Sequence, residues 1–152
     1  MAVSKLKQIS ENKLLALAIS IAADAFQDTM DKSGEPYILH CLYVMYKQTT
    51  VKRKIIAVLH DLIEDTEWEF EDLRKLGFGD DILDPLKLLT HDPMLKTYDD
   101  YIRDISTNKD ATAVKLADLE HNSQPFRLKG LTKSDHARIE KYHRSYVYLS
   151  KV

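Results

Sequence analysis

Apolar residues recur every three or four positions along most of the chain, and this spacing is typical of helices that bury one face. In the stretch 13–26, for example, Leu14, Ala18, Ile21 and Ala25 share a face, and Ser10 is a good cap for the first turn. The same pattern predicts helices over residues 13–26, 37–46, 51–65, 69–76, 82–89, 98–105, 111–122 and 132–149. No stretch alternates with the period of two that strands require. We therefore predict an all-α fold, a single bundle of about seven or eight helices spanning residues 1–152.

The composition agrees with a folded domain that needs no covalent staples. The 152 residues are 44% hydrophobic and 30% charged, which excludes a disordered or collagen-like chain. The net charge of −2 gives no overall basic field for nucleic acid, and no apolar stretch approaches the ~20 residues of a bilayer span. The single cysteine, Cys41, excludes an internal disulfide and fits a reducing compartment. We therefore expect a cytoplasmic protein with no nucleic-acid or membrane partner.

Four residues on three predicted helices could hold a metal ion. His40 lies on the second helix, the adjacent His60 and Asp61 near the end of the third, and Asp118 on the seventh. Neighbouring side chains on a helix diverge by about 100°, so His60 and Asp61 can line one wedge between helices. Two imidazoles and two carboxylates suit Mn²⁺, Fe²⁺ or Zn²⁺ better than Ca²⁺. On an octahedral ion they would leave two positions for water and a substrate oxygen, as metal-assisted hydrolysis requires.

Further polar residues lie one helical turn from these four. They are Glu64 and Asp65 on the third predicted helix, and Lys115 and Asn122 on the seventh. Residues 127–151 add a basic run that either forms a solvated face or helps to hold an anionic substrate. Spacing alone leaves two interpretations open, a metal site or a set of ordinary core histidines and solvated charges.

Three segments, taken together, resemble a known family. They are KSGEPYILH at 32–40, HDLIEDT at 60–66 and VKLADLEHN at 114–122. The order of His40, the His60–Asp61 pair and Asp118 matches the H…HD…D signature of the HD-domain metal-dependent phosphohydrolases. Around these residues the segments are similar to the hydrolase domains of RelA/SpoT proteins and to the small alarmone hydrolases.

This resemblance implies an all-helical HD fold that binds one divalent ion, most often Mn²⁺, with Zn²⁺ or Fe²⁺ as alternatives. It implies hydrolysis of the 3′-pyrophosphate of (p)ppGpp, a small phosphorylated nucleotide, or of a related phosphate. The residues carried over by position are His40, His60, Asp61 and Asp118 as metal ligands, Glu64 and Asp65 as the catalytic pair acting on water, and Lys32, Ser33, Lys115 and Asn122 as substrate-binding residues.

Two departures from the family pattern fall in substrate recognition. Asp31 stands where the family has an arginine that helps to hold the base, and Pro125 stands where a polar contact is common. The reaction class is therefore better defined than the nucleotide. The alternatives are an HD nucleotidase acting on a nucleoside monophosphate or an NADPH-like dinucleotide, and a non-catalytic nucleotide-binding HD module. His121, one turn from Asp118, is a candidate to support the ligands.

Overall fold

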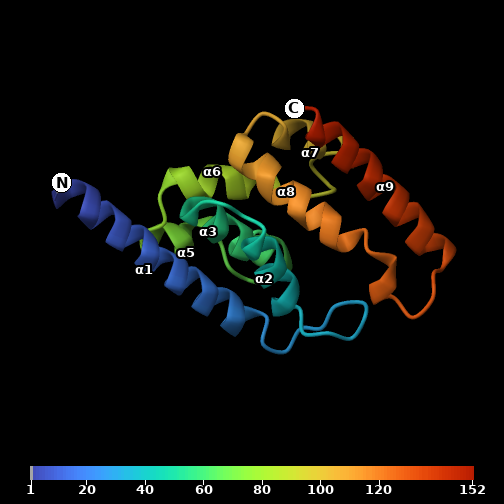
Figure 1. The fold of residues 1–152 in the computed structure, drawn as a ribbon, viewed down its shortest axis with the longest axis horizontal. Helices are drawn as coiled ribbons and strands as arrows, with labels where there is room; N and C mark the ends of the chain where they lie inside the picture. Colours follow the sequence, from blue (N-terminus) through green and yellow to red (C-terminus); the bar gives the residue numbers. More distant parts are fainter. Residues whose placement is uncertain (1) are drawn as a thin grey trace.

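The computed structural model describes the backbone of residues 2–152 and the side chains of residues 10–152, and this part of the chain contains helices and no strand (Figure 1). The elements in order are α1 (Ala2–Ala25), α2 (Ile38–Tyr46), α3 (Val51–Leu59), α4 (Leu62–Asp65), α5 (Phe70–Lys75), α6 (Asp80–Leu89), α7 (Tyr98–Ile105), α8 (Lys109–Asn122), the 3-10 turn η1 (Pro125–Arg127) and α9 (Lys133–Ser150). The predicted all-α fold is confirmed.

Helix α3 is the centre of the bundle. It packs against α1, α2, α6 and α8, and residues 55–59 at its C-terminal end are all buried. The segment 55–59 is apolar on every side, and it must be surrounded because no face of it is suited to water. The residue that follows this run, His60, is therefore carried into the interior of the protein.

Helices α8 and α9 form an antiparallel pair on the side of the bundle opposite α1 (Figure 1). α8 is the inner member, because seven of its residues are buried, including Lys115, Asp118 and His121. α9 is the outer member and buries only Ser145 and Leu149. Most of the basic run thus lies on α9, a helix that covers α8 from outside, whereas Arg127 ends η1 and Lys129 lies between the two.

Local sequence fixes several helix starts. The side chains of Thr50, Thr97 and Asn108 accept hydrogen bonds from backbone N–H groups in the first turns of α3, α7 and α8. Such caps satisfy donors that have no partner inside the helix. The structure differs at Ser10, which lies within α1 rather than at its start.

The predicted helix over 51–65 is broken at His60 and Asp61. The backbone N–H of His60 bonds to the carbonyl of Ala57 at 3.3 Å, a tightened turn, and Asp61 departs from ideal helical angles with φ −101° and ψ 0°. The chain then restarts as α4, whose backbone bond from Asp65 N–H to Asp61 O measures 3.0 Å. The break turns His60 and Asp61 toward the same space.

None of the described helices combines the length and the hydropathy that a bilayer crossing requires.

Candidate metal centre

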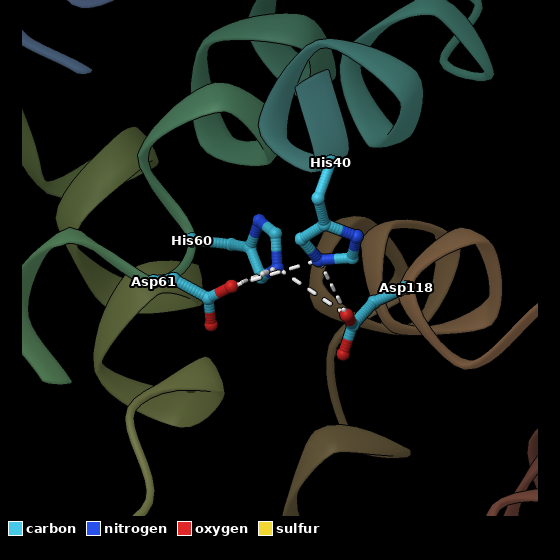
Figure 2. Close-up of side chains that lie close together, drawn as sticks. All are labelled: His40, His60, Asp61 and Asp118. Carbon is cyan, nitrogen blue, oxygen red and sulfur yellow. Dashed lines mark ion pairs between the residues drawn. The ribbon is translucent and has the colours of Figure 1, made fainter. Parts of the chain in front are cut away.

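Four predicted ligands meet in the interior of the bundle (Figure 2). His40 comes from α2, His60 ends α3, Asp61 precedes α4, and Asp118 comes from α8. His40 Nε2 lies 3.0 Å from an Asp118 oxygen, and His60 Nε2 lies 2.9 Å from an Asp61 oxygen. One ligand atom from each of the four residues falls within 4.8 Å of all the others, so the group could hold a metal ion.

The proton positions on the imidazoles fit a cation. His60 Nδ1 lies 2.6 Å from the carbonyl oxygen of Ala57, and because a carbonyl can only accept, Nδ1 carries the proton. Nε2 is then the ring nitrogen of His60 that remains to bind a cation, in place of a proton. The Nε2 atoms of His40 and His60 are both buried without a hydrogen-bond partner among the described residues. Two buried imidazole nitrogens that face two carboxylates are a typical divalent-metal arrangement.

The electrostatics of the centre favour positive charge. Burial lowers the pKa of the His60 imidazole, but the neighbouring Asp61 and Asp118 outweigh it and raise that pKa well above its ordinary value. Burial likewise raises the pKa of Asp118, but Lys115 outweighs it and holds that pKa well below its ordinary range. Burial also raises the pKa of Asp61, but His60 outweighs it and lowers that pKa, so both carboxylates present negative charge to the space between the imidazoles.

Each carboxylate is also held in place by a neighbour. Lys115 Nζ donates to one oxygen of Asp118 at 2.8 Å, and Asn122 Nδ2 donates to the other at 2.8 Å. The phenol of Tyr37 donates to Asp61 at 2.5 Å. These bonds fix the direction of the carboxylate lone pairs, which a metal site needs as much as the ligands themselves. Lys115 and Asn122, which the sequence predicted to bind substrate, therefore hold the predicted metal ligand Asp118 in place.

The predicted catalytic pair lies at the exposed edge of the centre. Asp61, Glu64 and Asp65 bring carboxylate oxygens within 4.8 Å of one another. Glu64 accepts a hydrogen bond from the backbone N–H of His91 at 2.7 Å, and partial desolvation raises its pKa. Partial desolvation and the charges of Asp61 and Glu64 raise the pKa of Asp65 to about 6. A carboxylate that titrates near neutral pH is suited to accept a proton from water.

Two cavities adjoin the centre. The first, which we term the loop-side cavity, measures about 270 Å³ and is lined by Met30, Asp31, Lys32, Ser33, Tyr37, Asn122, Gln124, Arg127, Leu128, Arg138 and Tyr142. The second, the helix-side cavity, measures about 320 Å³ and is lined by Glu64, His91, Pro93, Tyr98, Tyr101, Lys115, Asp118, Asn122, Lys141 and Tyr142. The predicted substrate residues therefore divide, since Lys32 and Ser33 face the first cavity, Lys115 faces the second, and Asn122 borders both.

Sequence reasoning missed Arg127, which forms an ion pair with Asp31 and lines the loop-side cavity. Its only signal was its place in the basic run. Burial raises the pKa of Asp31, but hydrogen bonds from Ser33, Glu35 and Arg127 bring it down to about 2. The charge of Asp31, the residue that departs from the family pattern, is thus compensated.

Sequence reasoning placed His121 only as a candidate supporter of the ligands, and the structure puts it against His40. The two Nδ1 atoms lie 2.7 Å apart. Burial, with His40 and Arg127 as neighbours, lowers the pKa of His121 to about 4, so this imidazole is neutral at neutral pH. Cys41, predicted to be a core residue, is fully buried.

The fold and the site together define a class of protein: an all-α bundle whose interior holds a centre of two histidines and two aspartates. The fold is similar to a solved structure described as a metazoan ortholog of SpoT that hydrolyses ppGpp and plays a role in starvation responses. The TM-score is 0.75 at 24% sequence identity, and the match covers 90% of this chain and 84% of that one.

In sequence, the chain is 36% identical over 93 residues to a guanosine-3′,5′-bis(diphosphate) 3′-pyrophosphohydrolase of Borreliella burgdorferi and 32% identical over 116 residues to its namesake in Haemophilus influenzae. It is 31% identical over 124 residues to the bifunctional (p)ppGpp synthase/hydrolase SpoT of Escherichia coli. These alignments cover 57%, 67% and 72% of this chain but only 14%, 17% and 18% of the relatives. No family model matches the sequence. The predicted resemblance to RelA/SpoT-type hydrolases is confirmed.

Proposed function

We propose that this chain is a divalent-metal-dependent phosphohydrolase that removes the 3′-pyrophosphate of (p)ppGpp. The observation that carries the proposal is the pair of buried, unpartnered Nε2 atoms of His40 and His60 facing the carboxylates of Asp61 and Asp118. The names of the relatives, which are (p)ppGpp hydrolases, supply the substrate class.

The four residues would hold one divalent ion, and Mn²⁺ is our first choice ahead of Zn²⁺ or Fe²⁺, because two carboxylates accompany two imidazoles. When bound, such an ion neutralises charge on phosphate oxygens and lowers the pKa of a coordinated water. Lys115 and Asn122 keep Asp118 oriented toward it, and Tyr37 does the same for Asp61.

Glu64 and Asp65 would take the proton of the attacking water. Both lie beside Asp61 at the exposed edge, where water has access. The bond from His91 N–H holds one oxygen of Glu64 in place. Partial desolvation raises the pKa of both carboxyls, that of Asp65 to about 6, which suits them to accept a proton near neutral pH. Two carboxylates this close titrate as a pair, so the proposal assigns the proton to the pair.

The two cavities favour a substrate with phosphate groups at two positions. Lys32 in the loop-side cavity and Lys141 in the helix-side cavity form no ion pair among the described residues. The other cations of the two cavities, Arg127, Arg138 and Lys115, are each paired with an aspartate. A nucleotide with diphosphates on both its 3′ and 5′ oxygens matches this division better than a nucleoside monophosphate does. An NADPH-like dinucleotide, which also carries phosphates at two positions, is the second candidate.

A substrate panel tests the proposal. The protein is incubated with Mn²⁺ and ppGpp, NADPH or GMP, with His60→Ala as the matched control, and products are identified by mass. The expected result is GDP and pyrophosphate from ppGpp and no turnover by His60→Ala. Phosphate release from NADPH alone would replace the first candidate by the second. Nucleotide binding without any product would support a non-catalytic module.

A further inference from the structure

A chain of polar contacts joins the loop-side cavity to the metal centre. The carboxylate of Asp31 accepts hydrogen bonds from the amide and hydroxyl of Ser33 at 2.9 and 2.7 Å, and it pairs with Nη2 of Arg127. Nη1 of Arg127 donates to the carbonyl oxygen of His121 at 3.2 Å and lies 3.1 Å from Nδ1 of the same residue, which in turn lies 2.7 Å from Nδ1 of His40. The other nitrogen of His40, Nε2, faces the ligand site.

The donors and acceptors of this chain allow one arrangement of protons. Nη1 of Arg127 carries two protons, one for the carbonyl oxygen of His121 and one for its Nδ1. Nδ1 then accepts, and neutral His121 carries its proton on Nε2. The contact between the two Nδ1 atoms needs one proton, which His40 alone is left to supply. Nδ1 of His121 then accepts from both neighbours in a three-centre bond. His40 is protonated on Nδ1, and its Nε2 keeps a lone pair for a cation.

His60 and His40 both carry a proton on Nδ1, but different acceptors hold that proton. His60 donates to the carbonyl of Ala57, which has no alternative to accepting. His40 donates to another imidazole, which can adopt either tautomer. The ring of Tyr43 stacks on His121 with centroids 4.1 Å apart and holds its plane, but a stacked ring can still carry its proton on either nitrogen. Arg127 removes this ambiguity.

We propose that Arg127 is a positioning residue that acts through His121 to fix the tautomer of His40, and thereby sets the affinity of the centre for its ion. The proposal rests on His40 being an ion ligand. In this proposal the ion pair between Asp31 and Arg127 has a positioning role, because Asp31 holds the guanidinium with Nη1 in contact with His121. It does not require that the substrate be (p)ppGpp.

The first experiment compares Arg127→Gln with the wild type in two measurements that need no nucleotide. Long-range ¹H–¹⁵N spectra of the ion-free protein near neutral pH report the tautomer of each histidine. Calorimetric titration with Mn²⁺ alone reports ion affinity. We expect His40 to change from the single Nδ1–H tautomer to a mixture and Mn²⁺ affinity to fall by ~10- to 100-fold, the usual effect of removing a group that supports a metal ligand.

Two controls make the result specific. The His60 signal in the same spectrum should keep its proton on Nδ1, bonded to Ala57, which shows that the variant is folded around the centre. Arg138→Gln should leave Mn²⁺ affinity within about twofold of the wild type, because Arg138 lines the same cavity but bonds to Asp135 on its own helix at 2.6 Å. An Arg127→Gln protein with an unchanged His40 tautomer and unchanged Mn²⁺ affinity overturns the proposal.

A second pair of variants keeps the test decisive if Arg127→Gln does not fold. In His121→Asn the amide oxygen can accept from His40, whereas in His121→Phe nothing can. We expect His121→Asn to bind Mn²⁺ at least about tenfold more tightly than His121→Phe. Equal affinities of these two variants contradict the proposal. Because no readout involves hydrolysis, failure of the (p)ppGpp assignment leaves this test intact.

Discussion

Lys115 is the most informative residue to remove, because its positive charge is buried and repels the expected cation. Its ammonium lies 2.8 Å from an Asp118 oxygen, and its side chain is 11% exposed. At an effective dielectric constant of about 20, the attraction over that distance is about 6 kcal/mol before desolvation is counted. Deleting one partner of a buried pair costs about 3–5 kcal/mol in practice, since the other charge is left uncompensated. Lys115→Met should therefore reduce the free energy of unfolding by about that amount when chelator keeps the protein free of ions.

Saturating Mn²⁺ should reverse part of this loss, because the cation compensates Asp118 in place of the missing lysine. Urea unfolding of wild type and Lys115→Met, each with chelator and with Mn²⁺, measures both quantities. Every 1.4 kcal/mol recovered corresponds to tenfold tighter ion binding by the variant. We expect removal of the repelling charge to outweigh the loss of one orienting bond, because Asn122 still donates to the other oxygen of Asp118, and Mn²⁺ affinity should therefore rise. Lys87→Met, which removes an exposed lysine far from the centre in sequence, is the control and should change neither quantity. A loss below about 1 kcal/mol in chelator, or an equal loss with and without Mn²⁺, would refute the reasoning.

Three further predictions concern the site and its support. His60→Ala should lose Mn²⁺ binding and turnover together, and metal content that stayed near one ion per chain would show that His60 is not a ligand. Glu64→Gln should keep the ion but slow turnover by at least ~100-fold, and near-normal turnover would assign the proton transfer to Asp65. Asp31→Asn should lower the free energy of unfolding by about 1–2 kcal/mol near pH 6, because three hydrogen bonds and an ion pair lose their anion. The pKa of Asp31 is depressed to about 2 in the folded state, so its contribution is present above its unfolded pKa and is lost as the pH falls toward 2. A wild-type advantage that persisted unchanged at pH 2 in urea titrations would show that the charge is not its source.

The all-α fold and the meeting of the four predicted ligands followed from the sequence, because helical periodicity is a local signal and the segment order resembled a family. The break in the helix at His60 and Asp61 could not be predicted from the sequence. Neither glycine nor proline marks it, and the apolar spacing continues through it to Ile63. A tightened turn and the bond of the His60 ring to Ala57 end the helix there, and neither leaves a trace in hydrophobic periodicity.

Arg127 shows a different limit. It is 96 residues from Asp31, and no spacing rule for helices connects positions that far apart. In the sequence it is one base among several, on a stretch that could equally face water. Only the packing of α8 and the η1 turn brings it beside the turn that Asp31 stabilises.

The placement of the centre also bears on the cohesion of the chain. His60 and Asp61 are joined by one peptide bond, so a local turn presets half of the donor set before any distant contact forms. The other two donors arrive on α2 and α8, which come from separate parts of the sequence. A bound cation would thus act as a cross-link among three helices in a chain whose single cysteine offers no internal disulfide. Local opening of either helix would release one donor, so slowed amide exchange in α2 and α8 on ion binding would report this cross-link directly.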